Sequence, residues 1–181
     1  MNVTLRPLRP GDEEAAVRWA ADPEFCRAAG WTPGLAPRLV RGHWRPIVAG
    51  AWPDFLRLGV EVGGALVGYV DLANLTREAG EFGIGIGERA RWGRGVGREA
   101  GGQMLAHAFG TLGLETVTAR VYAPNLRSHA LMRRLGFREA GRGEPEAYRG
   151  EVVEVVRYTL GRQEWTTRPG RSEGAGPSPF A

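Results

Sequence analysis

The sequence GEFGIGIGERARWGRGVGREA, residues 80–100, decides how the rest of the chain is interpreted. Its first part, 80–87, has the pattern of a strand, and its glycines predict that another backbone or a ligand lies close to it. Its second part, 91–97, is a glycine-rich turn that leads into a helix. Successive N–H groups of such a turn, with the positive end of the helix dipole, can bind a pyrophosphate. A tight turn without a ligand is the alternative.

Two familiar phosphate-binding loops do not fit this turn. A Walker loop requires a lysine, and the chain contains none. A dinucleotide-binding fingerprint, GxGxxG, belongs to a βαβ unit, whereas Gly93, Gly95 and Gly97 follow what we predict to be an antiparallel meander. Nucleoside triphosphate and dinucleotide ligands are therefore disfavoured.

Outward from this stretch, the apolar pattern predicts a mixed α/β domain of three layers. The expected strands cover residues 3–8, 55–62, 65–75, 80–87, 114–122, 137–140 and 151–160. The first expected helix begins at the N-cap Asp12. Two others cover 98–110 and 125–135, and further short helices are expected between 22 and 50. The domain is expected to span residues 1–161, and 162–181 to form a tail whose Trp165 and Phe180 pack on a second subunit or stay unpacked.

Length and composition fit one globular domain that needs neither a disulfide nor a metal. The chain has 181 residues, 43% of them hydrophobic, and a single cysteine, Cys26, with no metal-ligating residues near it. No window approaches the ~18 consecutive apolar residues of a membrane span, and the first residues lack a signal-peptide pattern, so we expect a cytoplasmic protein without a membrane partner. The net charge of +4 comes from scattered arginines, which disfavours nucleic acid as a partner.

Three segments together resemble the GNAT superfamily of acetyl-CoA-dependent N-acetyltransferases, and most closely its RimJ/RimL-like branch. They are WGRGVGREA at 92–100, RVYAPNLRSHALMRRLGF at 120–137 and AYRGEVVEVVRYTL at 147–160. Gly95 and Gly97 match the glycines of the family's loop pattern, Q/R-x-x-G-x-G/A. Trp92 departs from that pattern at its first position, but WGxGxG is the usual form in the RimL-like branch. The resemblance covers about residues 3–160.

This resemblance implies a GNAT-like acyl-CoA N-acyltransferase fold, in which two neighbouring parallel strands splay apart and admit the pantetheine arm of acetyl-CoA. Strands 80–87 and 114–122 would be that pair. It implies acetyl-CoA as the co-substrate, an amine as its partner and possible homodimers, with no metal. The coenzyme contacts that it implies are Ile84, Gly85, Ile86, Trp92, Gly93, Arg94, Gly95, Val96, Gly97, Arg98 and Asn125, with Arg91 adding charge. Solvated arginines at a helix start are the alternative for Arg91, Arg94 and Arg98.

The resemblance assigns catalytic roles to Ser128 and Glu146, and positions on the predicted strands make Tyr122 and Glu81 their alternatives. Ser128 matches the serine that protonates the departing thiolate, and Tyr122 is a second candidate acid. Glu146 aligns with the base proposed in this branch, with Glu81 as the other option. A helix would place Ser128 and Asn125 on one face, and Asn125 is also expected to cap that helix.

The expected function is transfer of an acetyl group to a primary amine by direct attack in a ternary complex. An α-amine, with a pKa of ~8, is closer to neutral at pH 7 than a lysine amine at ~10.4, which mildly favours a protein N-terminus over a lysine side chain. An aminoglycoside or polyamine acetyltransferase is one alternative. A non-catalytic regulatory module that binds coenzyme A is another.

Overall fold

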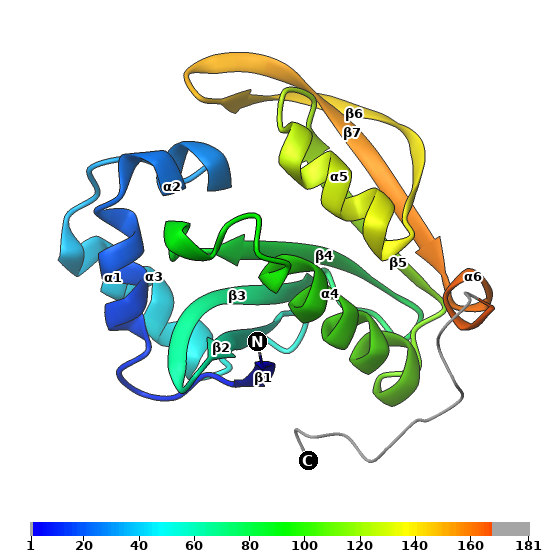
Figure 1. The fold of residues 1–181 in the computed structure, drawn as a ribbon, viewed down its shortest axis with the longest axis horizontal. Coiled ribbons are helices and arrows are strands. Elements are labelled where there is room, and N and C mark those ends of the chain that lie inside the picture. The colour runs from blue at the N-terminus through cyan, green and yellow to red at the C-terminus, as the bar shows by residue number, and fades with distance from the viewer. Residues whose placement is uncertain (1, 168–181) are drawn as a thin grey trace.

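In the computed structural model, which describes residues 2–167, seven strands form one mixed sheet in the order β1-β2-β3-β4-β5-β7-β6 (Figure 1). The strands are β1 (Val3–Pro7), β2 (Leu56–Val62), β3 (Ala65–Ala73), β4 (Ala79–Ile86), β5 (Thr116–Tyr122), β6 (Arg138–Tyr148) and β7 (Glu151–Gly161). The helices are α1 (Glu13–Ala20), α2 (Pro23–Ala29), α3 (Pro37–Val48), α4 (Val96–Ala106), α5 (Leu126–Leu135) and α6 (Arg162–Thr166). Short 3₁₀ and π-helical turns, Arg89–Arg91 and His107–Thr111, flank α4.

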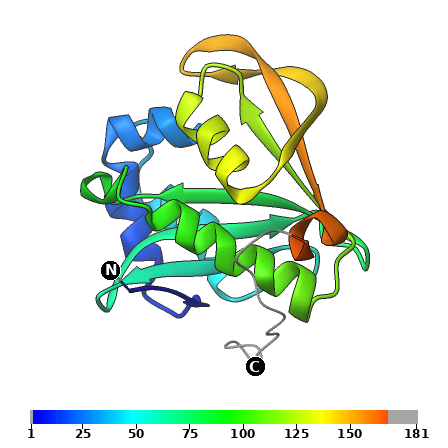
Figure 2. The same ribbon diagram turned by 45° about the vertical axis from the view of Figure 1, so that its right-hand side comes forward.

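The helices cover both faces of the sheet, which confirms the expected three-layer α/β fold. Side chains of a strand alternate between its faces. On β3, Val70 and Leu72 belong to the core shared with α4 and α5, whereas Tyr69 joins a second core with α1, α2 and α3. Figure 2 shows α4 and α5 on the same side of the sheet, over its two halves.

The central strands β4 and β5 run parallel, pair over a short stretch and then separate. Their pairing runs from Ala79–Thr116 to Phe82–Ala119 and ends there. Beyond that point β4 stays with β3 as far as Ile86, and β5 stays with β7 as far as Tyr122. The sheet therefore opens between residues 83–86 and 120–122, as Figures 1 and 2 show.

Two glycines, one in β4 and one just after it, make room for aromatic side chains of the same chain. A Cβ added to Gly85 would lie 2.6 Å from the Tyr69 ring, and one added to Gly87, just after the strand, 2.2 Å from the Trp19 ring. Trp19 is itself enclosed by Phe25, Trp44 and Tyr69. Aromatic rings therefore lie closest to these two glycines, and Gly85 also lines the cavity described below.

Three local predictions need correction. Asp12 sits at the N-cap of α1, but its carboxylate accepts hydrogen bonds from Arg6 and from the Arg9 N–H instead of capping the helix. The strand expected at 137–140 continues to Tyr148, because β6 pairs with β7 over that length. Trp165, assigned to the tail, is buried on Phe109 of its own chain, with ring centroids 5.7 Å apart. Phe180 lies outside the described residues.

Gly87→Ala should destabilise the fold by about 1–3 kcal/mol, because the enclosed Trp19 ring cannot yield to a new methyl group. Gly42→Ala is the control. Gly42 lies within α3, and a Cβ there would meet nothing within 4 Å, so this substitution should stabilise by about 0.5–1 kcal/mol. Urea unfolding measures both values. Equal stability of the Gly87→Ala variant and the unmodified chain would contradict the packing argument.

Candidate active site

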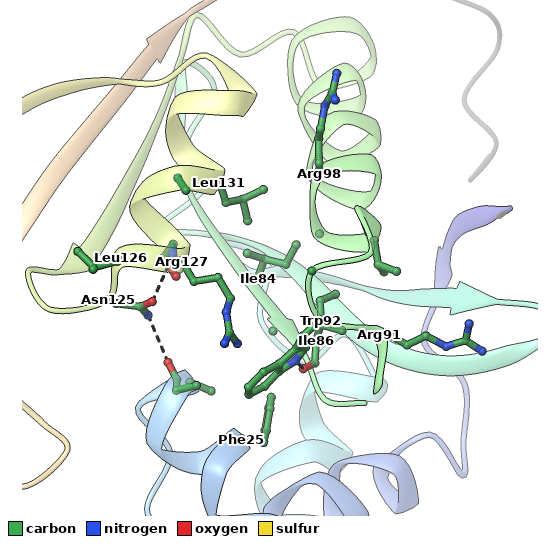
Figure 3. A pocket seen from close by; sticks show the side chains of 18 of the residues that line it. Phe25, Ile84, Ile86, Arg91, Trp92, Arg98, Asn125, Leu126, Arg127 and Leu131 are labelled. Atoms are coloured by element: carbon green, nitrogen blue, oxygen red, sulfur yellow. Dashed lines mark hydrogen bonds between the residues drawn. The ribbon is translucent and has the colours of Figure 1, made fainter. Parts of the chain in front are cut away.

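A cavity of about 400 Å³ lies where β4 and β5 separate, on the face of the sheet that α4 and α5 cover (Figure 3). Its walls come from β4, from the turn before α4, from α5 and from α2. The lining residues include Phe25, Ala28, Ala29, Ile84, Gly85, Ile86, Arg91, Trp92, Gly93, Gly95, Val96, Gly97, Arg98, Asn125 and Ser128. All of the expected coenzyme contacts except Arg94 line this cavity.

Backbone groups of β4 face the opening between the strands. Antiparallel neighbours alternate between hydrogen-bonded and non-bonded pairs. The N–H of Gly87 donates to the Val67 carbonyl at 2.9 Å, so Gly85, two residues earlier, also directs its N–H and C=O towards β3. Ile84 and Ile86 therefore direct theirs away from β3. The Ile86 carbonyl already accepts a hydrogen bond from the indole Nε1 of Trp92 at 2.6 Å, which joins the glycine turn to the end of β4.

The N-terminus of α4 has the properties of an anion site. Gly95 is its N-cap at φ +84°, and Gly93 lies at φ +72°, both in the region that favours glycine. The first N–H groups of a helix lack acceptors within it and carry the positive end of the dipole. A Cβ at Gly93 or Gly95 would meet no heavy atom within 4 Å, so the approach to these groups is open. These residues fit a bound pyrophosphate.

The cationic rim of this cavity differs from the expected one. Figure 3 shows Arg91 and Arg98 directed away from the centre of the cavity, whereas Arg127 extends from α5 towards Trp92. The Arg127 guanidinium lies 4.1 Å from the centroid of the Trp92 ring, within the range of a cation–π contact. Arg134 and Arg149 line the same cavity. The sequence analysis missed these three arginines, although Arg127 and Arg134, seven residues apart, lie on one face of a helix.

Asn125 and Ser128 lie at the base of the opening. The Asn125 side-chain oxygen accepts a hydrogen bond from the Ser128 N–H at 3.2 Å, which confirms Asn125 as the N-cap of α5. The Asn125 Nδ2 donates to the Ala28 carbonyl at 3.4 Å, and Figure 3 shows both bonds. The half-buried Ser128 hydroxyl has no hydrogen-bond partner among residues 2–167, so it is available to a ligand.

A second cavity, of about 300 Å³, reaches the opening from the other side. Its polar residues are Tyr69, Asp71, Glu81, Arg120, Tyr122, Asn125, Ser128 and Glu146. It shares five lining residues with the first cavity, namely Ala28, Ala29, Ile84, Asn125 and Ser128. Tyr69 and Asp71 are on the face of β3 opposite Val70 and Leu72, so the two cavities approach the gap between β4 and β5 from opposite sides.

A buried ion pair forms one side of the second cavity. Both carboxylate oxygens of Asp71 accept hydrogen bonds from Arg57, at 2.6 and 2.7 Å. Burial raises the pKa of Asp71, and the guanidinium of Arg57 opposes that rise. The Arg57 guanidinium also lies over the Tyr69 and Trp44 rings, at 4.2 and 4.7 Å from their centroids. Removing either member of such a pair leaves a buried charge, at a cost of about 3–5 kcal/mol.

The two candidate bases meet at one arginine that sequence reasoning did not find. Arg120 donates from Nε to Glu81 at 3.0 Å and from Nη1 to Glu146 at 2.5 Å. Tyr122, the second candidate acid, stacks on Tyr148 with ring centroids 4.3 Å apart. Burial, followed by the nearby Glu146 carboxylate, raises the pKa of Tyr122. Glu81, Glu146 and Tyr122 therefore share one cavity.

Helix α2 borders both cavities and is held at its carbonyl end. The Ala28 carbonyl accepts from Asn125 and from the Tyr148 hydroxyl, both at 3.4 Å. The Arg27 carbonyl accepts from the Arg149 Nε at 3.3 Å. These three side chains belong to the β5–β7 half of the molecule, so α2 bridges the opening between the two halves of the sheet.

Other reactive side chains lie away from both cavities. Cys26 is buried, and burial raises the pKa of its thiol. His129 is buried and hydrogen-bonds Tyr158 at 2.7 Å and the Ala123 carbonyl at 3.1 Å. Residues 2–167 contain no group of three or more His, Cys, Asp or Glu side chains able to hold a metal ion. None of the helices in this range combines the length and apolar character needed to cross a bilayer.

Comparisons with known proteins agree with this geometry. An N-acetyltransferase of Bacillus licheniformis, p20, is 25% identical over 170 residues, which cover 90% of this chain and 94% of the relative. The spermidine N-acetyltransferase of Vibrio cholerae, solved with CoA and spermine, superposes with a TM-score of 0.79 at 22% identity, over 90% of this chain and 97% of that one. RimJ of Mycobacterium smegmatis, solved with CoA-disulfide, superposes with a TM-score of 0.77 at 25% identity, over 90% of this chain and 83% of that one.

The family model described as acetyltransferase (GNAT) domain matches residues 2–138, about three quarters of the chain. The matched range contains the separating strands, the glycine turn and Ser128. The chain therefore belongs to the GNAT family and is an acetyl-CoA-dependent N-acetyltransferase.

Proposed function

We propose that this enzyme acetylates an α-amine, such as a protein N-terminus, by direct attack within a ternary complex. One observation carries the proposal: the two cavities meet at Ser128 and Asn125, where β4 and β5 have separated. A donor in the cavity beside α4 and an acceptor in the opposite cavity would then approach each other across a single layer of backbone. No enzyme nucleophile is needed, and the buried Cys26 lines neither cavity.

In this proposal acetyl-CoA supplies an acetyl group activated as a thioester, and the chain orients it. The N–H groups at the start of α4 bind its pyrophosphate, and the backbone of Ile84 and Ile86 orients the pantetheine arm. The Ser128 hydroxyl donates a proton to the departing thiolate. Glu146 receives the proton of the amine through a water molecule, with Glu81 as the alternative. Positioning supplies a large part of the rate.

The RimJ/RimL-like branch is the subfamily that we assign. The form WGxGxG at 92–97 supports it, because Trp92 donates its indole hydrogen bond to Ile86 and so shapes the turn. The similarity to Mycobacterium smegmatis RimJ, at 25% identity, supports the same assignment. An α-amine also loses its proton more readily near pH 7 than a lysine amine does.

A polyamine acetyltransferase is the second candidate. Three carboxylates, those of Asp71, Glu81 and Glu146, line the acceptor cavity and would attract a cation. The likeness to the spermidine N-acetyltransferase of Vibrio cholerae, at 22% identity, concerns the fold alone.

Gly95→Ala should weaken acetyl-CoA binding by about tenfold or more, because a residue with a Cβ disfavours the left-handed backbone that starts α4, at about 1–2 kcal/mol. The change in affinity is measured by thermal melting with acetyl-CoA, with NAD and ATP as ligand controls. Acetyl-CoA at a hundred times its dissociation constant should stabilise the unmodified chain by about 2.7 kcal/mol.

Gly34→Ala is the control, because Gly34 also lies at positive φ (+74°) and in open space. This variant should lose similar stability but keep its affinity for acetyl-CoA. Equal ligand shifts in both variants would count against the loop assignment.

Ser128→Ala should lower kcat for amine acetylation by about 10²-fold or more, the usual contribution of a general acid, with acetyl-CoA affinity unchanged. Release of the coenzyme A thiol gives the rate, and the thermal shift gives the affinity. Tyr122→Phe is the paired variant. If Tyr122→Phe lowers kcat and Ser128→Ala does not, the tyrosine is the acid.

Glu146→Gln should lower kcat most strongly when the acceptor is protonated, because that variant cannot accept the proton of the ammonium. The rate is measured from pH 6 to 9 beside Glu81→Gln. If only Glu81→Gln shows this loss, the base is Glu81.

A further inference from the structure

The guanidinium of Arg120 lies inside the proposed acceptor cavity, where a positively charged amine would otherwise bind. Arg120 is on β5, one residue beyond its last pairing with β4. From there its side chain reaches Glu81 on β4 and Glu146 on β6, which lie 39 and 26 residues away in the sequence. The arginine therefore joins three strands across the place where the sheet opens.

The charges of this cavity can be counted from the ion pairs. Asp71 has both oxygens bonded to Arg57, which compensates its charge. Glu81 and Glu146 share the single cation of Arg120. The cavity lining and Arg57 together therefore carry one net negative charge, which matches one ammonium group.

Arg120 is suited to share its position with a ligand. Its side chain is 51% exposed, so it can turn towards solvent without breaking a packed core. A planar guanidinium also bonds two carboxylates in different directions, which the point charge of a lysine ammonium does less well. When the hydrogen bond from Nη1 to Glu146 breaks, the Glu146 carboxylate becomes available to a ligand. The hydrogen bond from Nε to Glu81 then keeps Arg120 beside the cavity.

We propose that Arg120 determines acceptor specificity: it limits the enzyme to amines that bring one positive charge into the cavity and disfavours diamines and polyamines. This inference rests on the proposed function, because it takes the second cavity as the acceptor site. A second ammonium of a polyamine would meet the guanidinium instead of a free carboxylate. Like charges placed together in a binding site are an effective means of rejecting a competing ligand.

The test compares kcat/KM for spermidine with kcat/KM for a peptide amide that has no charged side chains and whose α-amine is its single amine. In the unmodified enzyme the peptide should be the better substrate. Arg120→Ala should raise the ratio of spermidine to peptide by about tenfold or more, because it leaves two carboxylates without a cation. Arg120→Lys keeps the charge, and its ratio should stay within about threefold of the original. Millimolar guanidinium ion should return the ratio of Arg120→Ala towards that of the unmodified enzyme.

Arg142→Ala is the matched control. Arg142 is also an exposed arginine, at 54%, and it also lies near two glutamates, Glu139 and Glu154, at 3.5 and 3.7 Å. It does not line the second cavity, so its removal should leave the ratio unchanged. Should Arg120→Ala fail to fold, Arg120→Gln replaces it, and failure of both would overturn the proposal by making Arg120 a structural residue.

The outcomes separate this inference from the proposed function. An unmodified enzyme that neither binds acetyl-CoA nor releases coenzyme A with any amine overturns the proposed function. An active enzyme whose substrate ratio is the same with and without Arg120 overturns the specificity role alone. An unmodified enzyme that prefers spermidine overturns both this role and the α-amine acceptor proposed above.

Discussion

The constraint on which this structure depends is the loss of backbone pairing between β4 and β5 after Phe82 and Ala119. Unpaired N–H and C=O groups in the middle of a sheet are costly unless water or a ligand satisfies them. Each strand keeps its outer neighbour, so the opening does not disturb the rest of the sheet. An extended chain such as a pantetheine arm offers hydrogen-bonding groups that can satisfy a strand in this position. The opening in the sheet is therefore where we propose that the pantetheine arm binds.

Packing on the two sides keeps the strands apart. On the β4 side, the glycines accept the Tyr69 and Trp19 rings, and these rings belong to the aromatic core under α1–α3. On the β5 side, α5 buries Met132 and Leu135 in the core that also contains Val156 of β7. Under α4 and α5 the two halves share one core, in which the ring centroids of Phe82 and Phe137 lie 5.9 Å apart.

Sequence reasoning identified what is encoded locally and missed what depends on register. The hairpin of β2 and β3 and the cap at Asn125 each have a signal within a few residues, whereas the parallel pairing of β4 with β5 was expected from the family resemblance. Arg120 has none, because its approach to Glu81 and Glu146 requires the parallel register of β4 with β5 and the antiparallel register of β6 with β7. Asp71 was missed for the same reason, since its partner Arg57 is on the neighbouring strand. The strand glycines do not identify their neighbours, because a close aromatic ring and a close ligand both require a residue without a side chain.

The position of α2 has a thermodynamic consequence. Ala28 and Ala29 border both cavities, and the last carbonyls of the helix accept hydrogen bonds from the opposite half of the molecule. Any displacement of this helix that accompanies occupation of one cavity changes the shape of the other. The two occupancies are then linked, and the factor by which one ligand alters the affinity of the other must be the same in both directions. With donor and acceptor in these cavities as proposed, this seven-residue helix would be the element that couples their binding.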